Sequence, residues 1–125
     1  MNILVRYLTQ YDPLQSPRAS RIIDGLSEDS PGFISLVALA ETVWVLQRSY
    51  GLSGPGLAPI LGKILQTSTF EVQNERQVFL AMIALESGAG AFSDALIAAL
   101  DTWAGCTETV TFDRKAARMP TFRLA

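Results

Sequence analysis

The stretch that decides the fold is residues 92–113, FSDALIAALDTWAGCTETVTFD. Its first part is rich in Ala, Leu and Ile, and it predicts a helix that is capped by Ser93 and runs through Ala104. The segment from Thr107 to Phe112 is rich in Thr and Val, which favours a strand. Asp113 follows that strand directly. A helix that leads into a short strand is the repeating unit of an α/β protein.

The same alternation extends over the whole chain. Further strands are predicted at 33–37, 69–73 and 121–124, and further helices at 2–10, 17–26 (with Ser16 as its cap), 38–50, 57–67, 75–86 (with Asn74 as its cap) and 114–118. Strands separated by helices indicate βαβ units and a parallel sheet. We therefore predict one α/β domain over residues 1–125, without internal repeats or linkers.

Composition excludes several classes of protein. The chain has 125 residues, 49% of them hydrophobic, and a net charge of −2, which is typical of a folded domain rather than a disordered segment. It contains no His, so catalytic triads and His-ligated metal sites are excluded. Cys106 is the only cysteine, which fits a reducing compartment. The longest apolar run, Val78–Leu85, is too short to span a bilayer, and we expect a cytoplasmic protein.

Three acidic residues stand at unusual places in apolar sequence. Glu41, Asp94 and Asp113 are each predicted where a strand or loop passes into a helix. In a parallel sheet these junctions share one edge, and carboxylates gathered there would repel one another unless a hard cation joined them. Mg²⁺ or Mn²⁺ is the natural choice, and such an ion supports hydrolysis of phosphodiesters. The three acids therefore predict a metal site with nuclease chemistry.

Each acid also has a purely structural interpretation. Asp113 precedes a predicted short helix and is a good N-cap on composition alone. Asp94 and Glu41 would gain from the dipole of the helix in which each lies. Both interpretations stay open at this point.

Four features of the chain match a known family in order and spacing. They are NILVRYL at 2–8, Glu41 within an apolar helix, FSDALIAA at 92–99 and TFD at 111–113. Together they resemble the PIN domain, and more narrowly the VapC-type toxins of bacterial toxin–antitoxin modules. The resemblance implies a three-layer fold, in which helices flank a parallel sheet, and a Mg²⁺- or Mn²⁺-dependent endoribonuclease.

The resemblance also implies roles for particular residues and partners. Glu41, Asp94 and Asp113 would be the catalytic residues and metal ligands, and Asn2 and Thr111 would support them. The substrate would be RNA, and the protein would form a homodimer that a cognate antitoxin protein holds inactive.

One departure from the family is large. The family opens with a central strand that ends in Asp-Thr-Asn; here Asn2 matches the Asn, Met1 stands at the Thr, and the strand with its Asp is absent from the sequence. Ala91 stands where the family often has an acid. Either the start is internal to a longer protein or this copy is degenerate. We expect a rearranged sheet, a strand supplied by another chain or low stability, together with weaker metal binding and catalysis.

Basic residues follow the last acid. Arg114, Lys115 and Arg118 are predicted to bind RNA phosphates, with Arg6 added if it lies on the same edge; the alternative is a solvated short helix. Trp44 and Trp103 are predicted to lie in the core. The alternative function for the whole chain is a catalytically inactive PIN-like module that dimerises or binds an antitoxin-like partner.

Overall fold

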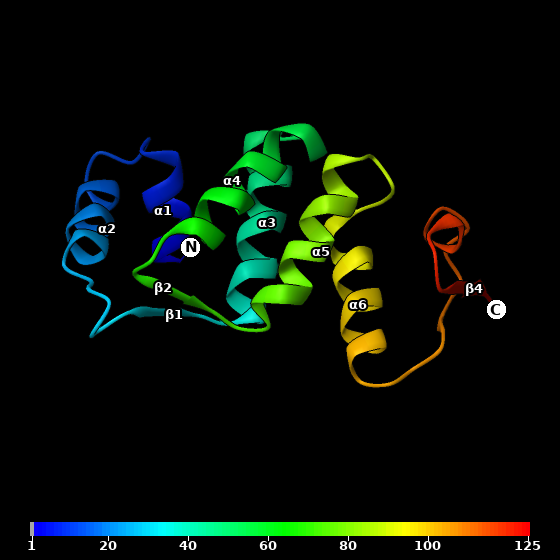
Figure 1. Ribbon diagram of the computed structural model, residues 1–125. Coiled ribbons are helices and arrows are strands. Elements are labelled where there is room, and N and C mark those ends of the chain that lie inside the picture. The colour runs from blue at the N-terminus through cyan, green and yellow to red at the C-terminus, as the bar shows by residue number, and fades with distance from the viewer. Residues whose placement is uncertain (1) are drawn as a thin grey trace. The chain divides into compact units, whose positions relative to one another are not determined.

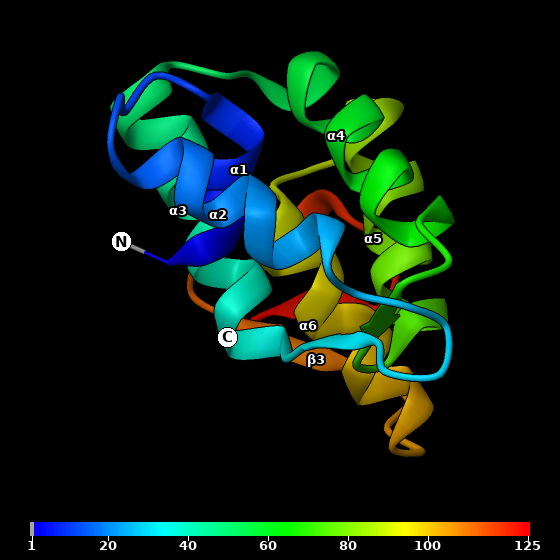
Figure 2. The same ribbon diagram turned by 90° about the vertical axis from the view of Figure 1, so that its left-hand side faces the viewer.

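The structure is a computed structural model that describes residues 2–125. It is a mixed α/β protein in which helices dominate and the strands are short (Figures 1 and 2). The elements are α1 (Ile3–Thr9), α2 (Gln15–Asp24), β1 (Gly32–Ile34), α3 (Leu36–Tyr50), α4 (Gly54–Gln66), β2 (Phe70–Val72), α5 (Glu75–Glu86), α6 (Phe92–Trp103), β3 (Thr109–Thr111), the 3-10 helix η1 (Ala116–Arg118) and β4 (Phe122–Leu124). Each helix and strand predicted from the sequence is present, in the predicted order.

The strands form two parallel ladders. β1 pairs with β2, and Phe33 lies opposite Glu71. β3 pairs with β4, and Val110 lies opposite Arg123. Among residues 2–125 each ladder is two strands wide. The predicted parallel pairing is therefore confirmed, in two separate sheets rather than in one.

Contacts divide the chain into two compact units. The first unit takes in the chain up to Leu52 together with Ile64–Gln73. In it α1 packs against both α2 and α3, and α1 and α2 lie side by side in Figure 1. Fully buried side chains of α1 and α3, Val5 and Leu39, belong to its core. The single domain expected over residues 1–125 stays a prediction.

The second unit takes in Ser53–Lys63 and Asn74–Ala125. Its centre is the pair α5 and α6, which lie side by side in Figure 1. Phe92 at the start of α6 and Val78 in α5 are buried. Gly54, at the start of α4, lies so close to Leu85 of α5 that a Cβ atom there would be 3.2 Å from its side chain, so the start of α4 packs closely on the end of α5.

The boundaries of the first strand and the third helix differ from the prediction. β1 ends at Ile34, because Ser35 is already the N-cap of α3. The Oγ atom of Ser35 accepts a hydrogen bond of 3.1 Å from the backbone N–H of Ala38. The predicted strand over 33–37 was therefore too long, and the helix begins at Leu36. It ends as predicted at Gly51, whose φ of 66° is a left-handed conformation that favours glycine.

Two predicted helix caps are wrong. Ser16 lies inside α2, where its buried hydroxyl has no hydrogen-bond partner within residues 2–125. The first turn of α2 is held instead by Asp12, whose Oδ1 accepts hydrogen bonds from the N–H groups of Gln15 (2.6 Å) and Leu14 (2.9 Å). Ser93 lies within the first turn of α6, and the N-cap is Ala91, which supplies no side-chain hydrogen bond.

The carboxylate of Asp12 makes the stability of the first unit depend on pH. The backbone N–H groups of Gln15 and Leu14, together with the positive charge of Arg6, lower the pKa of Asp12. A pKa that is lower in the folded state stabilises the fold above the unfolded value of about 3.9, and this contribution is lost as the pH falls through the folded value. We expect Asp12→Asn to lower the free energy of unfolding at pH 7, and the difference from the wild type to disappear at strongly acidic pH.

Urea unfolding at a series of pH values measures this difference. Asp24→Asn is the matched control, because Asp24 is exposed at the end of the same helix. A difference between the wild type and Asp12→Asn that stays constant from pH 7 to strongly acidic pH would contradict the assignment.

Candidate metal centre

Asp94 lies in the first turn of α6, at the positive end of the helix dipole. Its side chain is half-buried, and within residues 2–125 its carboxylate accepts no hydrogen bond from the protein. Both of its oxygen atoms are therefore available to a ligand.

Asp113 follows β3 and is held by its own backbone. Its Oδ1 accepts hydrogen bonds from the N–H groups of Lys115 (2.8 Å) and Ala116 (3.1 Å), and its own N–H donates to Oγ1 of Thr111 at 3.0 Å. The structural interpretation of Asp113 as a cap is therefore confirmed. It uses one carboxylate oxygen and leaves Oδ2 of this exposed side chain available.

A hydrogen bond joins α6 to β3. Oγ1 of Thr109, at the start of β3, donates to Oδ2 of Asp101, near the end of α6, at 2.7 Å. The two elements are in contact, and Figure 2 shows α6 beside β3. Asp94 precedes Asp101 by two helical turns, so both project from one face of α6.

The segments next to Asp94 and Asp113 make one close contact. Gly90, just before α6, lies so close to the buried side chain of Met119 that a Cβ atom there would overlap its sulfur. The segment that leads into Asp94 therefore packs against the segment that follows Asp113.

Glu41 lies in the other unit, on α3. The sequence argument placed it where a strand or loop passes into a helix, and this position is wrong. Glu41 lies beyond the first turn of α3 and is exposed. The helical period places it between Val37 and Trp44, which are also exposed, so an apolar neighbourhood in the sequence did not mean burial in the fold.

Asn2 joins α1 to α3 one residue from Glu41. Its Oδ1 caps α1 by accepting a hydrogen bond from the N–H of Val5 at 2.9 Å. Its Nδ2 donates to Oγ1 of Thr42 at 3.0 Å. The buried hydroxyl of Thr42 in turn donates to the carbonyl oxygen of Ala38 at 2.8 Å. Sequence analysis overlooked Thr42, although a polar residue next to Glu41 in an apolar helix was the available signal.

The donor set of the second unit suits a cation that needs few protein ligands. Within either unit of the described chain, no three Asp, Glu or Cys side chains gather closely enough to hold a metal ion between them. Mg²⁺ commonly binds through one or two carboxylates, keeps several waters and takes its remaining ligands from a substrate phosphate. In the second unit Asp94 and Asp113 each keep carboxylate oxygen atoms that accept no hydrogen bond within the described chain.

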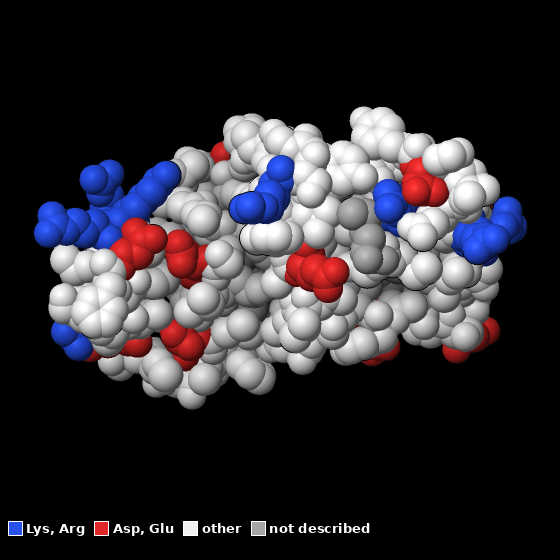
Figure 3. All heavy atoms as spheres, turned by 180° about the vertical axis from the view of Figure 1, so that it is seen from behind, with Lys and Arg blue, Asp and Glu red and all other residues white. Residues whose placement is uncertain are grey.

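The predicted RNA-binding residues divide between the units. Arg114, Lys115 and Arg118 are exposed and follow Asp113 directly. Figure 3 shows Lys and Arg gathered at its left edge, which is the end that carries β4 in Figure 1. Arg6 belongs to the first unit, where it lies 3.6 Å from the carboxylate of Asp12 and donates to Oε1 of Gln15 at 2.7 Å.

Both tryptophans lie outside the core. Trp44 is 57% exposed and Trp103 is 66% exposed, so the prediction that they are core residues is wrong. Trp44 is covered in part by the guanidinium group of Arg48, which lies 5.4 Å from the centre of its ring.

Comparison with protein-family models, curated proteins and solved structures finds no match to this chain. Among the helices described, none is long and apolar enough to cross a membrane.

The hydrogen bond between Thr109 and Asp101 gives a direct test of this geometry. Thr109→Val keeps the shape of the buried side chain but removes the donor, and we expect the free energy of unfolding to fall by about 1–2 kcal/mol. Thr107→Val is the matched control, because Thr107 is exposed and makes no side-chain hydrogen bond within the described chain. Urea unfolding compares the two variants. An equal effect of both substitutions would show that this bond does not hold α6 to β3.

Proposed function

We propose that this chain is a metal-dependent endoribonuclease of the PIN type, related to the toxins of toxin–antitoxin modules. The observation that carries the proposal is the close packing of Gly90, just before α6, on Met119, because it brings the segment that leads into Asp94 against the segment that follows Asp113. That second segment carries three exposed basic residues within five positions of Asp113. Carboxylates with free oxygen atoms beside a basic segment suit a site that binds a cation and a phosphodiester together.

Asp94 and Asp113 would hold Mg²⁺ or Mn²⁺ through the oxygen atoms that make no hydrogen bonds to the protein. The ion would supply an activated water and would stabilise the charge that develops on the phosphate. Thr111 and the N–H groups of Lys115 and Ala116 fix the orientation of Asp113, so the carboxylate has little freedom to lose when it binds a ligand.

The remaining residues bind and position the RNA. The exposed side chains of Arg114, Lys115 and Arg118 would contact phosphate groups on either side of the bond that is cleaved. Contacts of this kind hold the strand without reading its sequence, and they make binding strongly dependent on salt. Glu41 and Asn2, which the family resemblance implied as site residues, belong to the other unit, so the proposal rests on Asp94 and Asp113.

The partners follow from the same proposal. We propose a homodimer whose activity a cognate antitoxin protein suppresses. Exposed apolar side chains are what such contacts require, and α5 carries three of them on one side, Phe79, Leu80 and Ile83, which are 48%, 50% and 43% exposed.

That apolar side also favours the second candidate, an interaction module without catalysis. In that case Asp113 serves only as a cap, Asp94 serves only as a negative charge at the positive end of the α6 dipole, and the chain acts through contacts with another protein. The two candidates differ in whether the acids bind a cation and whether RNA is cleaved.

Cleavage of a structured RNA with Mg²⁺ or Mn²⁺ separates the candidates. We expect cleavage that requires the metal and that falls at least about tenfold in Asp94→Asn and in Asp113→Asn, because each loses a charged ligand. Asp29→Asn, in an exposed loop of the first unit, is the matched control and should cleave as the wild type does.

The chelator EDTA should abolish the activity of the wild type. Failure of the folded wild type to cleave RNA with either metal would favour the interaction module, and cleavage at wild-type rates in both variants would remove Asp94 and Asp113 from the mechanism.

A further inference from the structure

The strand β1 has one paired edge and one open edge. The N–H of Gly32 donates to the carbonyl oxygen of Thr69 at 2.8 Å, and the carbonyl oxygen of Ile34 accepts from the N–H of Gln73 at 2.9 Å. In a parallel ladder, alternate residues direct their backbone groups to the same neighbour. The N–H and C=O groups of Phe33 therefore face away from β2, where the described chain provides no third strand.

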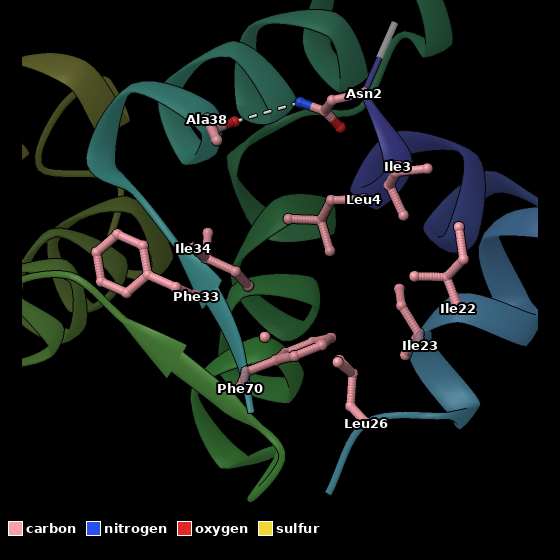
Figure 4. Close-up of a pocket in the computed structure, with 11 residues that line it drawn as sticks. Asn2, Ile3, Leu4, Ile22, Ile23, Leu26, Phe33, Ile34, Ala38 and Phe70 are labelled. Carbon is pink, nitrogen blue, oxygen red and sulfur yellow. Dashed lines mark hydrogen bonds between the residues drawn. The ribbon is translucent and has the colours of Figure 1, made fainter. Parts of the chain in front are cut away.

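An apolar cavity of about 340 Å³ lies beside β1, within the first unit. Helices α1 and α2 line its other side, and among the described residues Asn2 is its one polar lining residue (Figure 4). Phe70 and Ile34 point into the cavity, whereas the side chain of Phe33 points away from it and is 62% exposed. The cavity therefore borders β1 at Phe33, the residue whose backbone groups lie on the open edge of the strand.

Two hollows that share lining residues with this cavity carry basic residues. One shares Asn2, Ile3 and Ile22 with the cavity and adds Arg6 and Arg18. The other joins Arg18 to Arg21, again through Ile22. Arg6 is paired with Asp12, but Arg18 and Arg21 are exposed and make no ion pair within the described chain. The cavity and these two hollows, named here the apolar groove, are therefore bordered by two cations that lack a counter-charge.

We propose that this groove binds an extended polypeptide segment that adds to β1 as a further strand. The occupant has apolar side chains facing the cavity and a carboxylate at the end that reaches Arg18 and Arg21. Three features identify it. The open backbone groups of Phe33 match the backbone of a strand. The apolar lining matches apolar side chains, and the unpaired Arg18 and Arg21 match a negative charge.

A fatty acid would fill the apolar cavity and pair with Arg18 and Arg21, but it would not pair with the open backbone groups of Phe33. It carries no backbone N–H or C=O group to pair with Phe33, so those groups would lose water without gaining a partner. The strand edge therefore favours a polypeptide.

The test uses a capped, fluorescent heptapeptide of alternating valine and threonine, followed by two aspartates, and measures fluorescence anisotropy with the whole chain. Alternation places the valines on one face of a strand, toward the cavity. We expect binding that weakens at least about tenfold in Ala38→Leu, which fills the cavity. Ala40→Leu, exposed on the same helix, is the matched control and should bind as the wild type does.

Two further comparisons separate strand addition from other modes of binding. The same peptide with N-methyl groups at alternate residues keeps its side chains but cannot complete a ladder, and it should bind at least about tenfold more weakly. Arg18→Gln should weaken binding and reduce its dependence on salt, whereas Arg76→Gln, on a helix of the other unit, should change neither.

The outcomes that overturn the proposal are equally definite. Equal binding of the methylated and unmethylated peptides would exclude strand addition, whether or not the cavity variants fold. Decanoate that displaces the peptide at equal or lower concentration would identify the groove as a fatty-acid site. Failure of the wild type to bind the peptide would show that β1 is not open to a further strand.

Discussion

The hydrogen bond between Thr109 and Asp101 is the constraint that ties α6 to β3 in the second unit. The bond is charge-assisted and its donor is buried, which makes its loss costly. The tight packing of Met119 on Gly90 adds a second contact, between the segment that leads into Asp94 and the segment that follows Asp113. The proposed cation site rests on these two contacts.

The two units share a second constraint, which is that each sheet is only two strands wide. A two-stranded ladder is marginal alone and needs helices packed against it. In the second unit α6 and η1 cover the ladder of β3 and β4. In the first unit α1 and α2 leave a space beside β1, and that space is the apolar groove.

Local signals made much of the fold predictable from the sequence. Apolar residues at helical spacing, Thr- and Val-rich strands and Gly51 each act over a few neighbouring residues, so the order of the elements followed from them. The caps were less predictable. Asp12 caps the start of α2 from outside the predicted helix, and Ser16, the predicted cap, lies inside α2. The position of Asp113 directly after a strand also depends on neighbouring residues in the sequence, and it was predicted.

Properties that depend on tertiary packing were not predictable in the same way. Glu41 and Trp44 have apolar neighbours in the sequence, but the period of α3 turns both toward solvent. Thr109 and Asp101 are separated by the end of a helix and a loop, and no motif indicates that they pair. The division of the strands into two ladders depends on which edges find partners, which a single sequence does not reveal.

The most direct test of the central claim is the paramagnetic effect of Mn²⁺ on the amide NMR signals of the chain. Asp94 and Asp113 share a cation in this account, so a small amount of Mn²⁺ should broaden the signals of Asp94 and Asp113 together, along with their immediate neighbours. The signal of Asp29 should keep its intensity. Broadening at only one of the two acids, or at neither, would contradict the shared metal centre.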